Sequence, residues 1–329
     1  MKPEITDRIL IINDQDSFRE CALEIFRMQF AGNKVYADFI KNLGINPSNV
    51  KTPEEIPFLP VGFFKTQKVV TGTQPHVRIF ESSGTTSGES SRHYIVDIGI
   101  YEKSFLRSFN IFYGNPADYM IAAMLPSYTE RENSSLVYMM DKLIGMSSFP
   151  GSGFHKDNFE SLISAISEAR RNKNRVLLFG VSFALLDLAE KYSPDLHDVV
   201  VMETGGMKGR RKEVTRSELH SVLKKALNID IIHSEYSMTE LLSQAYSKGD
   251  GVFHCPPWMK ILIRDLQDPL TLVKEPGVTG GINIIDLANI HSCSFISTGD
   301  MGKLHKDGSF EVLGRIDNSD IRGCNLLIE

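Results

Sequence analysis

Apolar residues recur at helical spacing through the first part of the chain. Those between residues 18 and 29 are three or four positions apart, and those between 35 and 43 continue the stripe. Pro47 comes soon after and stops the second helix. Residues 53–60 hold three prolines and are expected to be extended, because proline disfavours helix at and before itself. We therefore expect residues 1–75 to form a helical N-terminal segment.

Between residues 76 and 250, short apolar runs alternate with amphipathic stretches. Thr215 and Glu218 match a capping box at the start of one such stretch. The expected strands are 77–80, 94–96, 121–125, 176–179, 199–202 and 229–232. The expected helices are 101–112, 136–143, 159–166, 185–189 and 219–227. Buried strands that alternate with helices predict an α/β core with a mostly parallel sheet flanked by helices on both faces.

After residue 250 the pattern changes to short strands separated by Pro, Gly and Asp turns. The runs are 260–264, 281–286, 294–297 and 310–313. They predict that residues 251–329 form a small antiparallel sheet or distorted barrel. In the parallel part of such a fold, ligands bind at the loops that leave the carboxyl ends of the strands.

Composition excludes several classes of protein. Charged residues make up 23% and hydrophobic residues 42% of the chain, and the net charge of -5 argues against a partner such as nucleic acid or an anionic membrane. No apolar run approaches the roughly 20 residues that cross a bilayer, and no signal-peptide core follows Met1. The four cysteines are far apart, with no CxxC pair, which is typical of a reduced, cytoplasmic protein.

The segment from Glu81 to Gly88 has the composition of an anion-binding loop. It combines hydroxyl side chains with two glycines four positions apart. Glycine lets backbone N–H groups approach an anion, and hydroxyls donate hydrogen bonds without adding fixed charge. The loop is not the common P-loop, because the Gly-Lys-Ser/Thr ending is missing. A flexible linker between two domains has the same composition.

Three later regions stand where a doubly wound sheet would place its site. Gly205 and Gly206 follow a predicted strand and would let a flat ring lie against the backbone, although a plain turn would look the same. Residues 233–240 place an aromatic ring, hydroxyls and a carboxylate together, but they also suit the start of a helix. Carboxylates at 297–300 and 314–317 could accept ribose hydroxyls, or could belong to hairpin turns.

The order of these motifs resembles that of the adenylate-forming superfamily, which includes acyl-CoA synthetases, peptide-synthetase adenylation domains and luciferases. Within it, the chain is most similar to the acyl-protein synthetases (LuxE-like) and to the related phenylacetate-CoA ligases. The strings that carry the resemblance are Ile56-Pro57-Phe58-Leu59-Pro60-Val61, Ser82-Ser83-Gly84-Thr85-Thr86, Ser234-Glu235-Tyr236-Ser237-Met238-Thr239-Glu240, and Gly314-Arg315 through Arg322-Gly323-Cys324. The resemblance covers the chain from about Ile56 to the end, and implies the large domain of an adenylate-forming enzyme.

The resemblance also implies an activity and a set of roles. A carboxylic acid, fatty or aromatic, would react with ATP in the presence of Mg²⁺ to give acyl-AMP and pyrophosphate. Thr239 would touch the α-phosphate and Glu240 would ligate Mg²⁺. Tyr236 would stack on the adenine, and Asp300 would take the ribose hydroxyls with Arg315 beside it. The other implied nucleotide contacts are Ser82, Ser83, Gly84, Thr85, Thr86, Ser87, Gly88, Gly205, Gly206 and Glu235.

Two departures from the family pattern stand out. The phosphate loop of the superfamily usually ends near a lysine, whereas this chain has Arg92, which would supply the missing positive charge or simply lie on the surface. The chain also stops at Glu329, just past Asp317 at the hinge position. The family's mobile C-terminal domain and its catalytic lysine are therefore expected to be absent.

Cys324 is the candidate acyl acceptor. Acyl-protein synthetases pass the acyl group to their own cysteine, and Cys324 is five residues from the end. A thiolate is a strong nucleophile toward an acyl-AMP, and the thioester stays reactive. A small packed residue in a final strand is the other interpretation. The resemblance leaves a partner acyl-acceptor or acyl-reductase protein and coenzyme A as further acceptors.

Two further features of the sequence give only weak signals. Some relatives carry a structural metal, but the spacing of the nearby His and Cys residues follows no compact zinc pattern. These residues are His254, Cys255, His291 and Cys293. The acyl group would enter under residues 179–182 and near 125–128, whose apolar character also fits ordinary core.

The sequence therefore predicts an ATP-dependent, AMP-forming acid–thiol ligase of the acyl-protein synthetase type. An acyl- or aryl-CoA ligase is the alternative within the enzymes. A non-catalytic nucleotide- or acyl-binding subunit is the alternative outside them.

Overall fold

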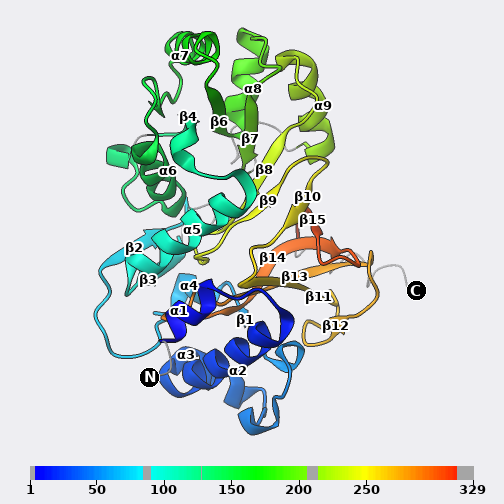
Figure 1. Cartoon of the computed structure of the whole chain (residues 1–329). Coiled ribbons are helices and arrows are strands. Elements are labelled where there is room, and N and C mark those ends of the chain that lie inside the picture. Colours follow the sequence, from blue (N-terminus) through cyan, green and yellow to red (C-terminus); the bar gives the residue numbers. More distant parts are fainter. Residues whose placement is uncertain (1–3, 84–89, 127, 206–213, 317–329) are drawn as a thin grey trace, which may run out of the picture.

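The N-terminal segment is helical, as predicted. The computed structural model of the chain describes residues 4–83, 90–126, 128–205 and 214–316 (Figure 1). Its first helices are α1 (Ile5–Leu10), α2 (Gln15–Gly32) and α3 (Lys34–Asn42). The side chains of Asp14 and Asn33 cap α2 and α3 by accepting hydrogen bonds from first-turn amides at 2.8 and 3.1 Å. Short helical elements follow at η1 (Pro47–Asn49), η2 (Pro53–Glu55) and α4 (Phe63–Thr66).

These helices pack beneath the antiparallel strands of the molecule (Figure 1). The buried side chain of Gln29 makes the contact specific, because its amide nitrogen donates to the carbonyls of Asn289 at 3.0 Å and Ile290 at 3.1 Å. Its amide oxygen accepts from the Ser294 backbone at 2.9 Å. The ring of Phe26 meets that of Phe295 edge-on, with centroids 6.2 Å apart. The N-terminal segment therefore fixes a turn that carries Asn289.

A two-stranded antiparallel hairpin carries the stems of the Ser/Gly loop. Its strands are β2 (Arg78–Glu81) and β3 (Arg92–Ile95), so both strands predicted near residues 77–80 and 94–96 are confirmed with shifted ends. Helix α5 (Ile98–Tyr113) follows and is capped by Asp97, whose carboxylate accepts from the Gly99 backbone at 2.8 Å. The loop between the two strands falls outside the described residues from position 84 to 89.

The large sheet begins with five parallel strands in the order β5-β4-β6-β7-β8. They are β4 (Tyr119–Met124), β5 (Gly153–Phe154), β6 (Arg175–Val181), β7 (Val200–Thr204) and β8 (His233–Tyr236). The connecting helices are α6 (Ser135–Met146), α7 (Phe159–Arg171), α8 (Ser182–Lys191) and α9 (Arg216–Leu227), with short elements η3 (Pro116–Asp118) and η4 (Tyr128–Glu130). Figure 1 shows β4, β6 and β7 between α6 on one side and α9 on the other, the layering that the alternating pattern predicts.

The antiparallel strands continue the same sheet. In the described residues the order runs β8-β9-β10-β15-β14-β13-β11-β12, and the short strand β1 (Leu59–Pro60) pairs parallel with β14. These strands are β9 (Ala245–Ser247), β10 (Val252–His254), β11 (Met259–Arg264), β12 (Leu272–Val273), β13 (Thr279–Asp286), β14 (Phe295–Leu304) and β15 (Phe310–Arg315). The predicted runs between 260 and 313 are strands. Among the helices that the structure describes, none has the length and apolar character to cross a membrane.

The strand predicted at residues 229–232 is wrong. Helix α9 ends at Leu227 and is followed by the C-cap residue Asn228, which has a left-handed backbone with φ of 53°; the next strand begins only at His233. A helix beginning at Ser234, the alternative reading of that segment, is also wrong. The real strand is polar because it lies opposite polar residues: Ser234 pairs with Glu203, and Glu235 pairs with Thr204. Apolar content therefore placed the strand in the wrong segment.

Candidate nucleotide and acid-activation site

The stems of the Ser/Gly loop are joined to each other. The Ser82 backbone donates to the Ser91 carbonyl at 3.1 Å, and the Ser91 backbone donates to the Ser82 hydroxyl at 2.9 Å. One residue further out, Arg92 faces Glu81 across the hairpin with 3.7 Å between Nε and Oε1. Both side chains are substantially exposed, so this ion pair contributes little stability and leaves Arg92 accessible to an anion. Residues 84–88, predicted to hold phosphates, lie outside the described residues.

The base of this loop reaches Glu240, although the two are about 150 positions apart in the sequence. The geometric link is the contact between His93, two positions after Ser91, and the Thr239 carbonyl next to Glu240. Burial raises the pKa of Glu240, and Ser91 and the charge of Arg315 oppose that rise. A buried carboxylate whose ionised form is poorly solvated gains from a nearby cation. The neighbouring Thr239 is anchored through its backbone carbonyl, which faces the His93 ring at 2.8 Å.

A second carboxylate, Asp300, lies in the same electrostatic neighbourhood. The Tyr236 hydroxyl donates to Asp300 Oδ2 at 2.7 Å, and the Asp300 backbone donates to the Thr298 hydroxyl at 3.0 Å. Arg315 pairs with Asp300 across β14 and β15, with 3.7 Å between Nε and Oδ1, but its side chain is 78% exposed. Burial raises the pKa of Asp300, against the Tyr236 hydrogen bond and the arginine charges. Asp300 in turn raises the pKa of Glu240, so the two carboxylates interact.

The ring of Tyr236 is almost fully buried. It meets Phe253 and Phe310 in edge contacts with centroids 6.0 and 5.8 Å apart. Burial, together with the charge of Asp300, raises the pKa of its hydroxyl, which therefore stays protonated and donates. The described contacts thus assign the hydroxyl to Asp300, while the stacking of the ring on adenine stays a prediction.

Gly205 is held by a buried polar cluster that the sequence reading did not identify as functional. The Ser182 hydroxyl donates to the Gly205 carbonyl and also to Glu203 Oε2, the latter at 3.1 Å. Glu203 Oε1 accepts from Arg216 Nε at 3.1 Å and lies 3.5 Å from His220 Nε2. Burial acts to raise the pKa of Glu203, but the hydrogen bond from His220 and the charge of Arg216 outweigh it and lower the pKa. Glu203 is therefore a buried anion.

The sequence did carry one signal for this cluster. Glu203 is a charged residue at the end of a strand that is otherwise apolar, and a buried charge requires partners. Gly205 itself has φ of 63°, a left-handed conformation that favours glycine. Gly206 lies outside the described residues. Glu235, also predicted to contact nucleotide, accepts a 2.5 Å hydrogen bond from the Thr204 hydroxyl and is buried beside Gly205.

The cysteines that the structure describes are poor nucleophiles. Cys21 and Cys293 are buried, and burial raises the pKa of both, to about 12 for Cys293. Burial and the charge of Asp286 also raise the pKa of Cys255. Cys324 and the hinge residue Asp317 lie outside the described residues. Among the described residues, no three His, Cys, Asp or Glu side chains form a group that could hold a metal ion, His254 and His291 included.

The segment predicted to line the acyl pocket is tightly packed at its centre. Phe179 and Val181 are buried, and a Cβ added at Gly180 would lie 2.9 Å from Leu185 Cγ and 3.3 Å from Met124 Cβ. Gly180 therefore lets β6 approach α8 closely. Whether an acyl chain enters beside it stays a prediction.

The fold is that of the adenylate-forming enzymes. An ATP-bound MatB from Rhodopseudomonas palustris superposes with a TM-score of 0.54 at 15% identity, over 72% of this chain and 47% of that one. A long-chain-fatty-acid-CoA ligase from Archaeoglobus fulgidus gives 0.53 at 16% identity, over 76% and 53%. The chain thus matches about half the length of these solved structures.

A curated relative is similar to this chain over almost its whole length. A long-chain-fatty-acid–luciferin-component ligase of Aliivibrio fischeri is 22% identical, over 98% of this chain and 93% of that protein. No family model matches the chain. The resemblance carried by the sequence motifs, to the adenylate-forming superfamily and within it to the acyl-protein synthetases, is confirmed by these comparisons.

Proposed function

We propose that the protein activates a carboxylic acid, a fatty acid first of all, with ATP and transfers the acyl group to a thiol. In the first step a carboxylate oxygen bonds to the α-phosphorus of ATP while the bond from that phosphorus to the pyrophosphate oxygen breaks. In the second, a thiolate attacks the acyl carbon and AMP leaves. The fatty character of the acid rests on the curated relative, whose name is that of a long-chain-fatty-acid ligase.

One observation carries this proposal. The fold brings together strand β3 after the Ser/Gly loop, the Thr239 backbone next to the buried Glu240, and the Tyr236–Asp300 pair, although more than two hundred positions separate His93 of β3 from Asp300. A loop suited to phosphates, a carboxylate suited to a cation and a carboxylate suited to a ribose make up a nucleotide site. Catalysis in such a site is positioning and electrostatic stabilisation rather than covalent work by the protein.

Different residues would bind different parts of the nucleotide. Residues 82–88 would surround the phosphates, and Arg92 would add positive charge, since its ion pair with Glu81 is long and exposed. Asp300, fixed by the Tyr236 hydroxyl, would accept the ribose hydroxyls. Gly205 and Gly206 would border the adenine, on which Tyr236 would stack. Thr239 would contact the α-phosphate.

Glu240 fits a magnesium ligand. Mg²⁺ is commonly held by one or two carboxylates together with substrate phosphates, so a single buried carboxylate beside the phosphate loop suffices. The raised pKa of Glu240 marks a carboxylate whose surroundings in this structure do not fully solvate its charge. When bound there, Mg²⁺ would neutralise phosphate charge.

Cys324 is our candidate acceptor on the chain itself, because the three described cysteines are held as protonated thiols. A partner acyl-reductase protein would then take the acyl group from Cys324. A partner acyl-acceptor protein or coenzyme A is the alternative acceptor in place of Cys324. We also propose a cytoplasmic location, where a reactive thiol stays reduced.

The first test measures pyrophosphate release from Mg-ATP with a panel of fatty and aromatic acids, followed by intact mass. We expect acid-dependent release and an acyl mass shift that Cys324→Ala abolishes. Release without the shift would assign an external thiol such as coenzyme A. ATP binding without release under any acid would instead indicate a non-catalytic binding subunit and overturn the proposal.

Asp300→Asn tests the nucleotide assignment. Losing charge-assisted hydrogen bonds to the ribose costs about 1.5–3 kcal/mol, or roughly 10- to 100-fold in the Kd for ATP. Asp268→Asn, at an exposed turn, is the matched control and should bind ATP as wild type does. Because burial raises the pKa of Asp300, we also expect ATP affinity to weaken on acidification at a higher pH than an ordinary aspartate would give. Equal Kd values for Asp300→Asn and wild type would reject the ribose role.

A further inference from the structure

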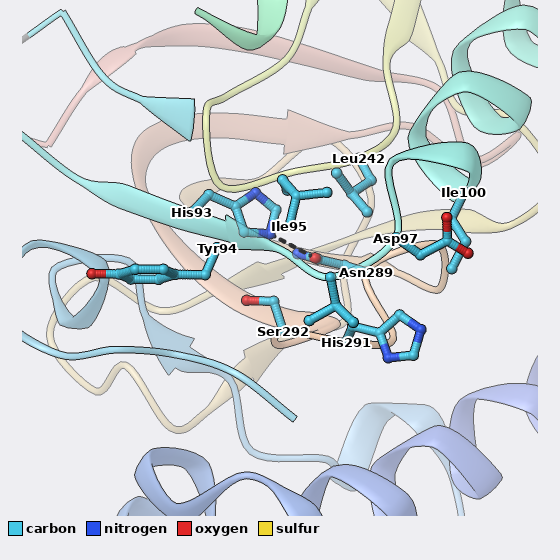
Figure 2. Close-up of a pocket in the computed structure, with 10 residues that line it drawn as sticks. His93, Tyr94, Ile95, Asp97, Ile100, Leu242, Asn289, His291 and Ser292 are labelled. Atoms are coloured by element: carbon cyan, nitrogen blue, oxygen red, sulfur yellow. Dashed lines mark hydrogen bonds between the residues drawn. The ribbon is translucent and has the colours of Figure 1, made fainter. Parts of the chain in front are cut away.

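His93 binds neither nucleotide nor acid in the proposed function, yet its ring contacts the backbone of Thr239, which would face the α-phosphate. It stands on β3, five positions after Gly88, and is almost fully buried. The ring of Phe64 meets it at 89° with centroids 5.8 Å apart. Figure 2 shows its ring pointing toward Asn289, on the turn between β13 and β14. A buried polar ring beside the phosphate loop requires partners.

Both ring nitrogens of His93 lie close to an oxygen atom of another chain segment. Nδ1 lies 2.8 Å from the carbonyl oxygen of Thr239, and Nε2 lies 3.0 Å from Asn289 Oδ1. The amide nitrogen of Asn289 donates in turn to the carbonyls of Glu240 at 2.8 Å and Cys293 at 2.9 Å. His93 and Asn289 thus hold the backbone of residues 239 and 240 from two sides.

The hydrogen-bond pattern fixes the orientation of both side chains. If the Asn289 amide were flipped, its oxygen would face two carbonyls, so the nitrogen must point toward Glu240 and Cys293. Its oxygen then faces the His93 ring. A carbonyl oxygen can only accept, so Nδ1 carries a proton and donates to Thr239. Burial lowers the pKa of His93 to about 4, so the ring is neutral near pH 7 and this is its one N–H. Nε2 therefore packs against the Asn289 oxygen without donating a hydrogen bond to it.

Asn289 is itself held rigidly from behind. The turn that carries it is bound by Gln29 of α2, whose amide donates to the Asn289 carbonyl at 3.0 Å. The N-terminal helices therefore fix the position of Asn289. Asn289 in turn holds the backbone of residue 240 through its side-chain amide.

We propose that His93 is a positioning residue, which together with Asn289 sets the placement of the Thr239–Glu240 backbone relative to strand β3, which follows the Ser/Gly loop. This inference rests on the proposed function, because it assigns Thr239 and Glu240 to the reacting phosphate. His93 touches neither nucleotide nor acid in this assignment. It acts through the two backbone carbonyls. Displacing a reacting group by about 1 Å can cost on the order of 100-fold in rate.

A cavity beside the ring bears on which variants can be tested. It has room for about one water molecule, with a volume of about 10 Å³, and is lined by His93, Asn289 and Ser292 among others (Figure 2). When the ring is truncated, water can therefore extend from this cavity and hydrogen-bond to the exposed Thr239 carbonyl. We expect His93→Ala to fold for this reason.

The experiment compares His93→Ala, His93→Gln and Asn289→Ser with wild type in pyrophosphate release. We expect kcat to fall 10- to 100-fold in His93→Ala, with the KM for the acid within twofold of wild type. The amide of His93→Gln can donate to the Thr239 carbonyl. On a logarithmic scale, its kcat should therefore recover at least a third of the fall in kcat seen in His93→Ala. The double variant with Asn289→Ser should be no slower than the worse single variant, since both act on the same backbone.

Tyr36→Phe is the control for stability alone. It removes a buried hydrogen bond of 2.6 Å to the Pro57 carbonyl, outside the proposed site, so the urea midpoint should fall while kcat does not. A folded His93→Ala with wild-type kcat would overturn the inference. The inference would also be overturned if kcat falls no more in His93→Ala than in Tyr36→Phe when the two variants show the same change in urea midpoint.

Two results keep this test separate from that of the proposed function. If wild type releases no pyrophosphate, the proposed function fails and kcat is not compared. Hydrogen exchange of the wild-type protein with and without ATP then tests the positioning role instead. The same measurement is used if the variants do not fold. We expect ATP to slow exchange at residues 90–95 and 239–242 together. Protection of one segment alone would overturn the coupling.

Discussion

Glu203→Gln removes one charge from a buried cluster and leaves its shape almost unchanged. In the wild-type protein the Glu203 carboxylate is 3% exposed, and it accepts from Ser182 at 3.1 Å and from Arg216 at 3.1 Å. His220 Nε2 lies 3.5 Å away. The glutamine can still accept one hydrogen bond, but Arg216 loses its counter-charge.

The size of the effect follows from the exposure of the partners. Removing one partner of a buried ion pair costs about 3–5 kcal/mol. The Arg216 side chain is 27% exposed, so its guanidinium can turn partly toward water, and it keeps a hydrogen bond of 2.8 Å to the Val312 carbonyl. We therefore expect a loss of about 2–3 kcal/mol in the free energy of unfolding at pH 7, below the full cost of an uncompensated charge.

The loss also depends on pH, with a defined sign. The surroundings lower the pKa of Glu203 in the folded state, so its ionised form stabilises the fold above the unfolded pKa of about 4.3. That contribution disappears as the pH falls through the folded pKa. The difference between wild type and Glu203→Gln should therefore be full at pH 7 and should shrink below about pH 4.

Urea unfolding followed by tryptophan fluorescence measures this difference. Trp258 is the chain's one tryptophan and is fully buried, so it reports global unfolding. Glu54→Gln is the control, because the Glu54–Lys260 pair is 2.8 Å long but about half exposed, and its loss should cost no more than about 1 kcal/mol. A Glu203→Gln protein as stable as Glu54→Gln at pH 7, or one whose deficit persists unchanged at pH 3.5, would refute the reasoning.

Two further changes test the antiparallel part of the sheet and its buried polar network. Gly302→Ala places a Cβ 2.3 Å from a carbonyl oxygen of the facing strand, so we expect the free energy of unfolding in urea to fall by about 1–3 kcal/mol or more. The control Gly62→Ala, whose Cβ would have nothing within 4 Å, should be neutral. Equal urea midpoints for the two variants would contradict the close approach at Gly302. Ser243→Ala removes a 2.6 Å hydrogen bond to the buried Asp286 and the 3.0 Å acceptor of the Trp258 indole, so stability should fall by about 1–3 kcal/mol and the tryptophan emission maximum should shift; an unchanged spectrum would exclude the contact.

The helices and most strands could be predicted because their signals are local. The apolar periodicity between residues 18 and 43 and the capping box at Thr215 depend on neighbours a few positions away, and the structure has helices at both places. The strand at 229–232 failed for the same reason. A strand whose side chains face a polar site, as Ser234 and Glu235 do, lacks the apolar content by which buried strands are found.

The candidate site could be predicted only in part. The resemblance to the adenylate-forming superfamily indicated Tyr236, Glu240 and Asp300 as candidates, because each lies in a short motif that follows the family's order. The polar cluster behind Gly205 could not be found that way. Ser182 on α8 and Arg216 and His220 on α9 hold Glu203, and only the packing of these two helices against β7 brings them together.

By itself, then, the sequence determined the alternation of helix and strand, the anion-binding composition of the loop at 81–88 and the likeness to adenylate-forming enzymes. Periodicity, glycine and hydroxyl content are properties of short segments. Only the tertiary structure decided that His93 reaches Thr239 and Asn289, 146 and 196 positions away, and that the Tyr236 hydroxyl binds Asp300. Such contacts exist because the buried strands and helices must satisfy their polar groups within the folded chain, and the partners available there depend on topology rather than on sequence distance.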